Sequence, residues 1–86
     1  MTYRVELTPR ARRDLRSLGR DVAARLQIHI DALEHEPRPR GVKKLVAEDD
    51  VYRIRVGAYR ILYQIQERVP LVLIVKIAPR REAYRR

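Results

Sequence analysis

The sequence predicts a two-layer α+β domain, in which an N-terminal strand and a helix hairpin pack on a small, mostly antiparallel sheet with a short C-terminal tail. Three stretches lead to this prediction. Residues 51–66 alternate like two strands joined by a tight turn, residues 9–35 carry two amphipathic helical patterns, and residues 71–77 are the most apolar run. A chain of 86 residues is expected to form a single domain, residues 1–86, with one modest core.

The first strand and the first helix are expected to adjoin each other. Residues 3–7 alternate between apolar and polar side chains, as in a half-buried strand. Thr8 is a favoured N-cap residue and Pro9 suits the first helical position, so the pair predicts a helix over residues 9–18. Gly19 is expected to end this helix, because glycine readily adopts the left-handed conformation that follows many helix C-termini.

The second helix is expected to begin with Asp21 as its N-cap and to continue to about His35. With only a short loop at Gly19, the two helices would form an αα-hairpin. Ile28 lies off the apolar stripe of this helix, where it is either an ordinary surface residue or part of a partner contact. The stripe itself consists of Val22, Leu26, Ile30 and Leu33.

A β-hairpin is predicted within residues 51–66, with its reversal at Gly57 and Ala58, because glycine accepts the positive φ that a two-residue turn requires. Alternation gathers Arg53, Arg55 and Arg60 on the outer surface of this hairpin. Clustered guanidinium groups are suited to binding phosphate. The inward-facing residues are Tyr52, Ile54, Val56, Tyr59, Ile61, Tyr63 and Ile65.

The apolar run 71–77 lacks alternation until Lys76, which predicts a central strand covered on both faces. Lys76 is expected to join the hairpin arginines on the open face of the sheet. The tail directly follows this strand, so Arg80, Arg81 and Tyr84 could lie beside those arginines and complete a phosphate-directed site. Tyr84 would stack on a base or pass a proton, or alternatively would simply pack on the sheet.

The charge of the chain favours a polyanionic partner. It carries 20 Lys+Arg against 11 Asp+Glu, a formal net charge of +9. Such an excess fits nucleic acid, an anionic membrane or an acidic protein. Most of the excess is arginine, which favours bidentate phosphate contacts and base stacking, and this points to nucleic acid. A solvated basic surface without a partner is the alternative.

Several kinds of site are excluded by the residues present. The chain has no cysteine, so disulfides, zinc–thiolate sites and cysteine nucleophiles are impossible. His29 and His35 are six residues apart on one helix, with no accompanying set of carboxylates, so neither a metal nor a cofactor is expected. No apolar run approaches the roughly 18 residues of a membrane span. We therefore expect a soluble, cytoplasmic protein that does not bind membranes.

The segments YRIRVGAYRILYQI and VLIVKIAPRREAY resemble the RelE family of toxins from type II toxin–antitoxin systems. The likeness covers nearly the whole chain and includes RDLRSLG in the helix hairpin and GVKKL before the sheet. The resemblance implies a RelE-like fold and a ribosome-dependent mRNA endonuclease, which a cognate antitoxin protein would neutralise. It assigns the catalytic role to Arg53, Arg55, Arg60, Arg80 and Tyr84.

The remaining cations are expected to bind RNA. They are Lys43, Lys44, Lys76 and Arg81. Lys43 and Lys44 would mainly add sequence-independent attraction to ribosomal RNA. Because no metal-activated water is expected, the 2′-hydroxyl of the mRNA is the expected nucleophile, and cleavage would leave a 2′,3′-cyclic phosphate and a 5′-hydroxyl.

Two features depart from the family pattern. Arg53 and Arg55 occupy paired strand positions where some members carry lysines, one of which is thought to act as the base, and arginine holds its proton too firmly for that role. Pro79 stands where relatives often place His or Lys. Lys76 is the only amine at the end of the last strand, which makes it the candidate general base, and its direction stays open at the level of sequence.

Two further functions fit the same sequence. The chain could be a ParE-like toxin that inhibits DNA gyrase by binding it, without catalysis, or a simple basic nucleic-acid-binding module. The short helix hairpin and the retained Arg80 and Tyr84 weigh against the first of these. The second would account for the charge but not for the positions of Arg80 and Tyr84.

Overall fold

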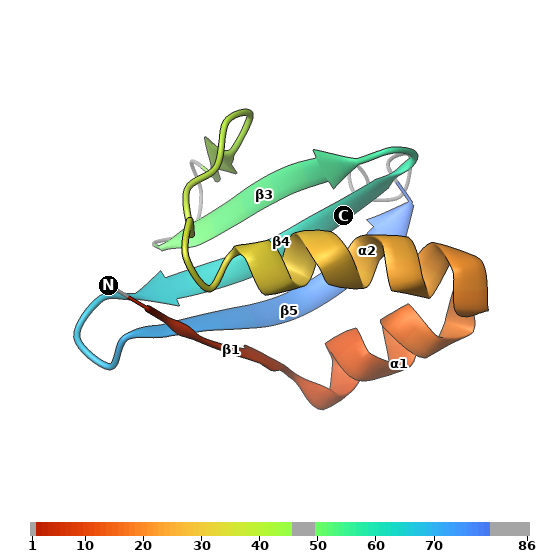
Figure 1. The fold of residues 1–86 in the computed structure, drawn as a ribbon, viewed down its shortest axis with the longest axis horizontal. Coiled ribbons are helices and arrows are strands. Elements are labelled where there is room, and N and C mark those ends of the chain that lie inside the picture. The colour runs from red at the N-terminus through yellow and green to blue at the C-terminus, as the bar shows by residue number, and fades with distance from the viewer. Residues whose placement is uncertain (1, 46–49, 80–86) are drawn as a thin grey trace.

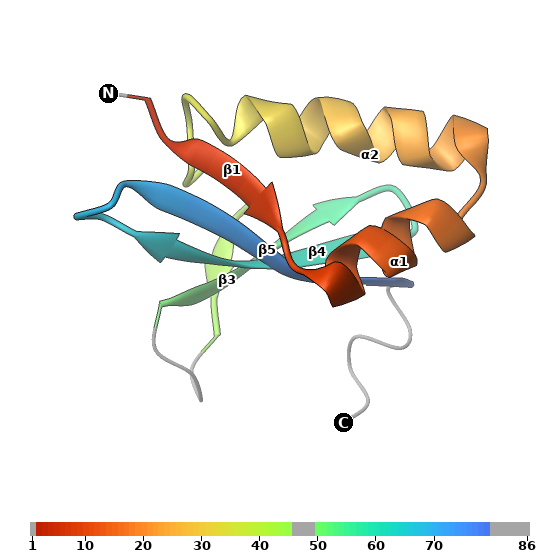
Figure 2. The same ribbon diagram turned by 90° about the horizontal axis from the view of Figure 1, so that it is seen from below.

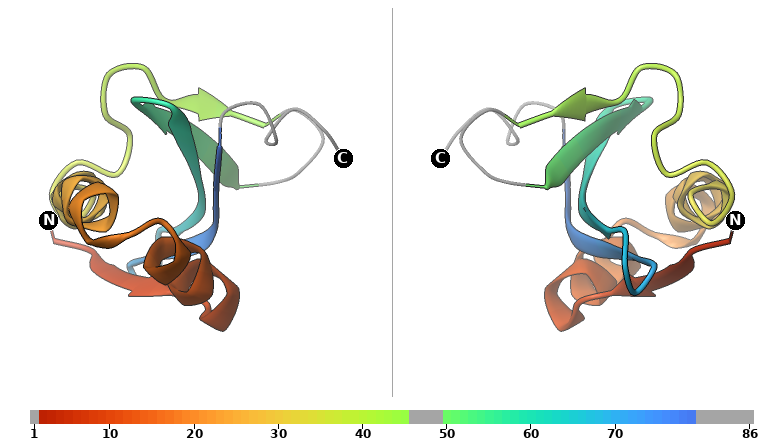
Figure 3. Two further views of the ribbon diagram at one scale, coloured as in Figure 1. Left: turned by 90° about the vertical axis from the view of Figure 1, so that its right-hand side faces the viewer. Right: turned by 90° about the vertical axis from the view of Figure 1, so that its left-hand side faces the viewer.

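The computed structural model describes residues 2–45 and 50–79. In chain order its elements are β1 (Arg4–Leu7), α1 (Pro9–Ser17), α2 (Arg20–Ala32), β2 (Lys43–Lys44), β3 (Val51–Val56), β4 (Tyr59–Gln66) and β5 (Leu71–Pro79). The strands form one five-stranded sheet in the order β1-β5-β4-β3-β2, and both helices lie on the same side of it (Figures 1 and 3). β1 runs parallel to β5 and the other neighbouring strands are antiparallel, which confirms the predicted fold class.

The core lies between the two helices and the inner face of the sheet. The predicted stripe of α2 is confirmed, because Leu26, Ile30 and Leu33 are fully buried and Val22 packs against them. Full burial of such a side chain stabilises the fold by roughly 1.5–3 kcal/mol. The sheet contributes Tyr52, Ile54, Val56, Ile61, Tyr63, Ile65, Val72, Ile74 and Ile77.

The start of α1 is formed as its sequence predicts. The Oγ1 atom of Thr8 accepts a hydrogen bond from the backbone N of Ala11 at 3.1 Å, and Pro9 occupies the first turn. Gly19 has a φ of 89° and separates the two helices. The prediction that Asp21 caps α2 is wrong, because Gly19 takes the N-cap position and Asp21 lies in the first helical turn.

α2 ends at Ala32, before the predicted end near His35. Beyond Ala32 the chain continues with the tighter i→i−3 hydrogen bonds of a 3₁₀ turn, such as the one from the N of His35 to the O of Ala32 at 3.2 Å. Ile28 on its outward side is 69% exposed, as expected for a residue off the apolar stripe. Within the described ranges, neither helix is long and apolar enough to span a membrane.

The hairpin of β3 and β4 has its predicted reversal, with Gly57 at a φ of 60°. β2 was not expected, because a strand of two residues is too short to show alternation. β2 pairs with Tyr52 and Arg53 only, so among the described residues it leaves the part of the β3 edge toward Val56 without a neighbouring strand.

β5 lies between β1 and β4, as predicted for the apolar run. The prediction that both of its faces are covered holds for one face only. Val72 and Ile74 are buried beneath the helices, whereas Leu71 and Leu73 on the outer face are half-buried. The missing alternation in this run therefore has another cause than burial on both faces.

Part of that cause is a one-residue shift in the pairing of β4 with β5, which acts from Val75 onward, whereas Leu71 and Leu73 before it are apolar side chains on the outer face. Tyr63 pairs with Ile74 and Leu62 pairs with Lys76, so Val75 is an extra residue on β5. Such a β-bulge changes which side chains of the bulged strand face the core. The residues after Val75 are therefore out of phase with those before it, and a strictly alternating pattern cannot be seen in the sequence.

Candidate functional site

Two rows of cross-strand neighbours form the candidate site on the outer face of the sheet, opposite the helices. The rows are Lys43, Arg53, Leu62 and Lys76 in one, and Arg55, Arg60 and Ala78 in the other. Paired residues that share a face have Cβ atoms roughly 4.5–5.5 Å apart. The structure thus brings five of the predicted cations together, and we refer to these five as the arginine face.

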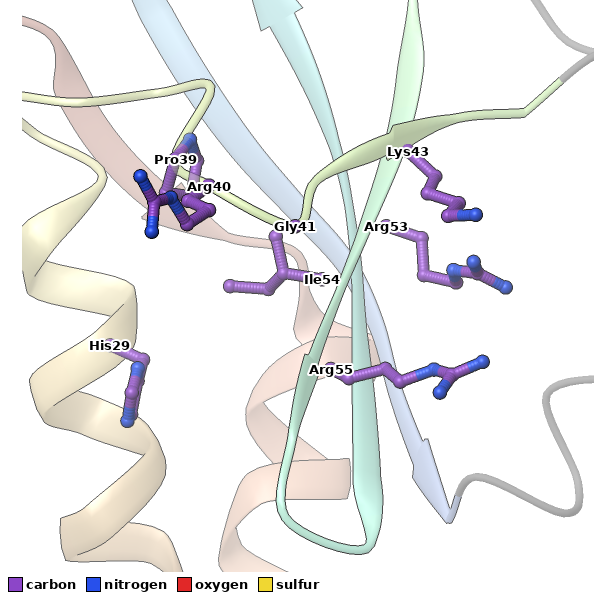
Figure 4. Close-up of a pocket in the computed structure, with 8 residues that line it drawn as sticks. All are labelled: His29, Pro39, Arg40, Gly41, Lys43, Arg53, Ile54 and Arg55. Atoms are coloured by element: carbon purple, nitrogen blue, oxygen red, sulfur yellow. The ribbon is translucent and has the colours of Figure 1, made fainter.

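The side chains that Figure 4 labels show how this surface is built. Lys43, Arg53 and Arg55 project to one side of β3, whereas Ile54 between the two arginines points to the other side (Figure 4). Strand alternation alone separates the charged from the apolar residues here. Arg55 and Arg60 are directly opposite each other in the register, and like charges in that position destabilise a sheet.

Arg60 is the predicted site residue whose environment differs most from expectation. The sequence places it on an open face, but its side chain is only 1% exposed. The reason lies in its strand, since β4 is in the middle of the sheet and Arg60 is flanked by Arg55 on β3 and by the buried Ala78 on β5. Burial makes this guanidinium a fixed charge in a region of low dielectric, where electrostatic interactions are strong.

The other two arginines are more accessible. Arg55 is exposed and Arg53 is half-buried. The Nε atom of Arg53 is inaccessible to solvent and makes no hydrogen bond with the described part of the chain.

The three predicted lysines occupy different positions. Lys76 is half-buried on the outer face, opposite Leu62, so the structure answers the question of its direction in favour of the arginine face. Lys43 is exposed and pairs with Arg53, which puts it on the same face. Lys44 is also exposed but pairs with the inward-facing Tyr52, so it lies on the other face of the edge strand.

A cavity of about 440 Å³ adjoins the arginine face at the uncovered edge of β3. It extends from α2 across the loop before β2, and its lining residues are His29, Pro39, Arg40, Gly41, Lys43, Arg53, Ile54 and Arg55 (Figure 4). Sequence reasoning did not assign His29 or Arg40 to a site. Their proximity to β3 depends on how the loop packs against the sheet, for which the sequence carries no periodic signal.

A polar cluster fixes the start of that loop to the end of the sheet where β1 begins and β4 ends. The hydroxyl of Tyr3 donates a hydrogen bond to Glu67 Oε1 at 2.6 Å, and Arg38 Nη2 donates to Glu67 Oε2 at 2.6 Å. The bonds from Tyr3 and Arg38 hold the pKa of Glu67 below its ordinary value. The hydrogen bond to Glu67 raises the pKa of Tyr3. Arg38 and Glu67 are largely exposed, so the ion pair between them is weak by itself.

Two tyrosines extend this cluster into the core. Arg38 Nη2 also donates to the hydroxyl of Tyr52 at 3.2 Å, and its guanidinium lies over the Tyr52 ring at 5.1 Å from the centroid. Tyr52 stacks on Tyr63, whose hydroxyl donates to the O of Pro37 at 2.8 Å. Burial raises the pKa of Tyr63 well above its ordinary value, so it stays a neutral donor. The cluster thereby positions the loop that lines the cavity.

Part of the predicted site lies outside the described residues, namely Arg80, Arg81 and Tyr84. Within residues 2–45 and 50–79, no group of three His, Asp or Glu side chains is arranged to hold a metal ion. The side chains that do come together are positively charged and surround the half-buried Leu62. Their chemistry is suited to holding an anion and to stabilising negative charge that develops on it.

Comparisons with known proteins identify the family of this chain. The family model described as the ParE toxin of the type II toxin–antitoxin system, parDE, matches residues 5–84. The chain is 34% identical over 87 residues to toxin RelG of Mycobacterium tuberculosis, an alignment that covers 100% of each chain.

Two solved structures have a closely similar fold. In the archaeal RelE–RelB complex from Pyrococcus horikoshii OT3, the matching chain is 36% identical with a TM-score of 0.81, covering 93% of this chain and 97% of that one. In the toxin–antitoxin complex RelBE2 from Mycobacterium tuberculosis, the matching chain is 31% identical with a TM-score of 0.82, and the match covers 93% of this chain and 93% of that one.

Proposed function

This chain belongs to the RelE/ParE superfamily of type II toxin–antitoxin toxins, and on that basis we propose that it is a ribosome-dependent mRNA endonuclease that inhibits translation in the cytoplasm. The observation that carries the proposal is the arginine face. Lys76 and the buried Arg60 lie on neighbouring strands beside Arg53 and Arg55, where they could hold one phosphate from several sides.

The proposed reaction needs no metal. The 2′-oxygen of the mRNA attacks the adjacent phosphorus, the bond from phosphorus to the 5′-oxygen breaks, and a 2′,3′-cyclic phosphate and a 5′-hydroxyl result. One proton leaves the 2′-hydroxyl and another is delivered to the 5′-oxygen. Lys76 is the candidate acceptor of the first proton, since it is the amine that β5 presents on the arginine face.

The other residues have supporting roles in this proposal. Arg60 and Arg80 hold the phosphate, while Arg53 and Arg55 orient the RNA and stabilise the developing charge. Tyr84 stacks on a base or assists the leaving 5′-oxygen. The cations that contribute attraction to RNA without taking part in the chemistry are Lys43, Lys44 and Arg81.

End-group analysis of mRNA cut in a purified translation system tests this function. We expect a 2′,3′-cyclic phosphate and a 5′-hydroxyl, and we expect an mRNA with a 2′-deoxy nucleotide at the cleavage position to stay intact. A 5′-phosphate product, or full-rate cleavage of the 2′-deoxy substrate, would show that water is the nucleophile and that the proposed roles are wrong.

A cognate antitoxin is the proposed protein partner. Two similar structures are complexes of a toxin with its antitoxin, and a net charge of +9 favours an acidic chain that is partly disordered when free. Co-expression with the product of the adjacent reading frame should yield a co-purifying complex and relieve growth arrest. If that product neither co-purifies nor relieves the arrest, the antitoxin assignment fails.

A ParE-like inhibitor of DNA gyrase is the second candidate, because the matching family model is that of the ParE toxins. Such a protein would block DNA supercoiling by purified gyrase and leave mRNA on the ribosome uncut. The two assays, run on one preparation of the chain, give opposite results for the two candidates.

A further inference from the structure

The bulge of β5 determines which way Lys76 points. Ile74 and Ile77 are three residues apart, and both are buried in the core. Residues three apart on a regular strand face opposite sides of the sheet. The extra residue Val75 removes this conflict, because it lets Ile77 return to the core and leaves Lys76 on the outer face, opposite Leu62.

Three hydrogen bonds hold the bulge, two from Thr8 at the junction of β1 and α1 and one to Asp14 on α1. The N of Thr8 donates to the O of Ile74 at 3.0 Å, and Thr8 Oγ1 donates to the O of Val75 at 3.4 Å. The N of Ile77 donates to Oδ2 of Asp14 at 3.1 Å. Figure 2 shows why this junction can reach the bulge, since β1 runs beside β5 and α1 begins where β1 ends.

At Ile77, Asp14 accepts the hydrogen bond that a neighbouring strand would otherwise accept. β1 pairs with β5 only as far as Ile74, so β1 offers no carbonyl to the N–H of Ile77. The carboxylate of Asp14, projecting from α1, accepts that hydrogen bond instead, and Arg10 Nε lies 3.7 Å from the same oxygen. An unpaired buried N–H would cost free energy, so this bond favours the bulged arrangement over a slipped one.

We propose that Asp14 is a positioning residue for the RNA-cleaving site: it fixes the β5 bulge and thereby keeps the amine of Lys76 on the arginine face. This inference rests on the proposed function. Asp14 lies on the helix layer, on the opposite side of the sheet from the RNA, and acts only through Ile77 and Lys76. Its role does not require contact with the substrate.

A double-mutant cycle between Asp14 and Lys76 tests the coupling. Asp14→Ala should lower the kcat of cleavage on the ribosome by up to about 10²-fold with little change in KM, as expected when a reacting group is misplaced by about 1 Å. Added to Lys76→Ala, the same change should cause no further loss of kcat. Two independent, multiplying losses, or an unchanged kcat in Asp14→Ala, would overturn the proposal.

Matched variants separate positioning from folding. Asp14→Asn keeps an oxygen acceptor for Ile77 and should retain most of the rate, whereas Arg10→Gln removes only the ion pair and should leave kcat unchanged. If Asp14→Ala does not fold, Thr8→Val removes the hydroxyl bond to Val75 and should show the same lack of additivity with Lys76→Ala. Equal kcat losses in Asp14→Asn and Asp14→Ala would contradict the acceptor role.

A structural measurement keeps this inference independent of activity. In the wild-type chain, NMR should show a slowly exchanging Ile77 amide and a cross-strand contact between Lys76 and Leu62, and in Asp14→Ala both should be weakened. If the wild-type chain cuts no mRNA, the proposed function fails while this measurement still tests the bulge. If Asp14→Ala leaves both NMR signals unchanged, Asp14 does not hold the bulge, whatever the enzyme does.

Discussion

On β3 and β4, successive residues belong to two surfaces with opposite character. The inward residues include Ile54, Ile61 and Tyr63, which are buried against the helices. The outward residues include Arg55 and Arg60, which are directly opposite each other on the neighbouring strands. The two surfaces share one backbone, so the difference between them comes from the side chains alone.

The contrast shows which residues serve the fold and which serve another purpose. Inward side chains remove apolar surface from water and stabilise the domain. Outward arginines placed opposite each other repel, and one of them is also buried at a desolvation cost. We therefore expect the inner face to govern stability and the outer face to govern activity.

The largest effect is expected for a truncation on the inner face. Ile61→Ala removes a fully buried side chain and should lower the free energy of unfolding by roughly 2–5 kcal/mol, since a cavity is left behind. Leu62→Ala, on the outer face of the same strand, removes a half-buried side chain and should cost clearly less. Urea denaturation of both variants measures the difference, and equal losses would contradict the division between the two faces.

The next largest effect is expected on activity and not on stability. Arg55→Ala should lower the rate of mRNA cleavage on the order of 10²–10³-fold, by analogy with the loss of one donor to a developing oxyanion. Its free energy of unfolding should change by no more than about 0.5 kcal/mol, because Arg55 is exposed on the outer face and its removal leaves no cavity in the core. Arg12→Ala, which removes an exposed arginine of α1, is the matched control and should retain the rate on bound substrate. A rate loss as large in the control would refute the special role of the outer face.

A smaller effect is expected at the edge of the outer face. Lys43→Ala should weaken binding to ribosomes and reduce the slope of log K against log salt by about 0.7–0.9, the value for one lost phosphate contact. Lys44→Ala should also weaken binding, but less, because Lys44 lies on the other face of β2. Binding titrations at several salt concentrations measure both slopes. Loss of turnover at saturating ribosome in either variant would show that these lysines take part in the chemistry.

The smallest effect concerns the polar cluster, which belongs to neither face. Hydrogen bonds from Tyr3 and Arg38 lower the pKa of Glu67, so the stability they contribute is present above the ordinary pKa of 4.5 and is lost as pH falls below it. Thermal melting between about pH 3 and 6 should therefore show a decline that Glu67→Gln lacks. A Glu67→Gln profile with the same acid decline would assign that decline to other carboxylates.

Patterns that depend on neighbours in sequence could be predicted. The alternation of residues 51–66 and the glycine at its centre gave the bounds of the hairpin, and Thr8 with Pro9 gave the start of α1. The same alternation correctly placed Arg53 and Arg55 on one face. These features arise from local backbone geometry, which a single segment of sequence contains.

Features that depend on distant contacts could not be predicted. The bulge at Val75 is fixed by Thr8 and by Asp14, which lies 63 residues before its partner Ile77 in the sequence. Arg60 is buried because its strand is in the middle of the sheet. Alternation of side chains shows on which face of the sheet a residue lies, but not how deeply it is buried there. The cavity beside β3 likewise depends on packing between α2 and a loop without periodic pattern.

The parallel pairing of β1 with β5 also has a consequence for the order in which the domain can form. Thr8 and Val75 are 67 residues apart, and contacts of such long range form slowly because closing a large loop costs chain entropy. During synthesis from the N-terminus, the helices and the β3–β4 hairpin can form while β1 still lacks its neighbouring strand. Lys76 reaches the arginine face only when β5 is inserted between β1 and β4, so a nascent chain lacks this amine on that face until β5 has been made.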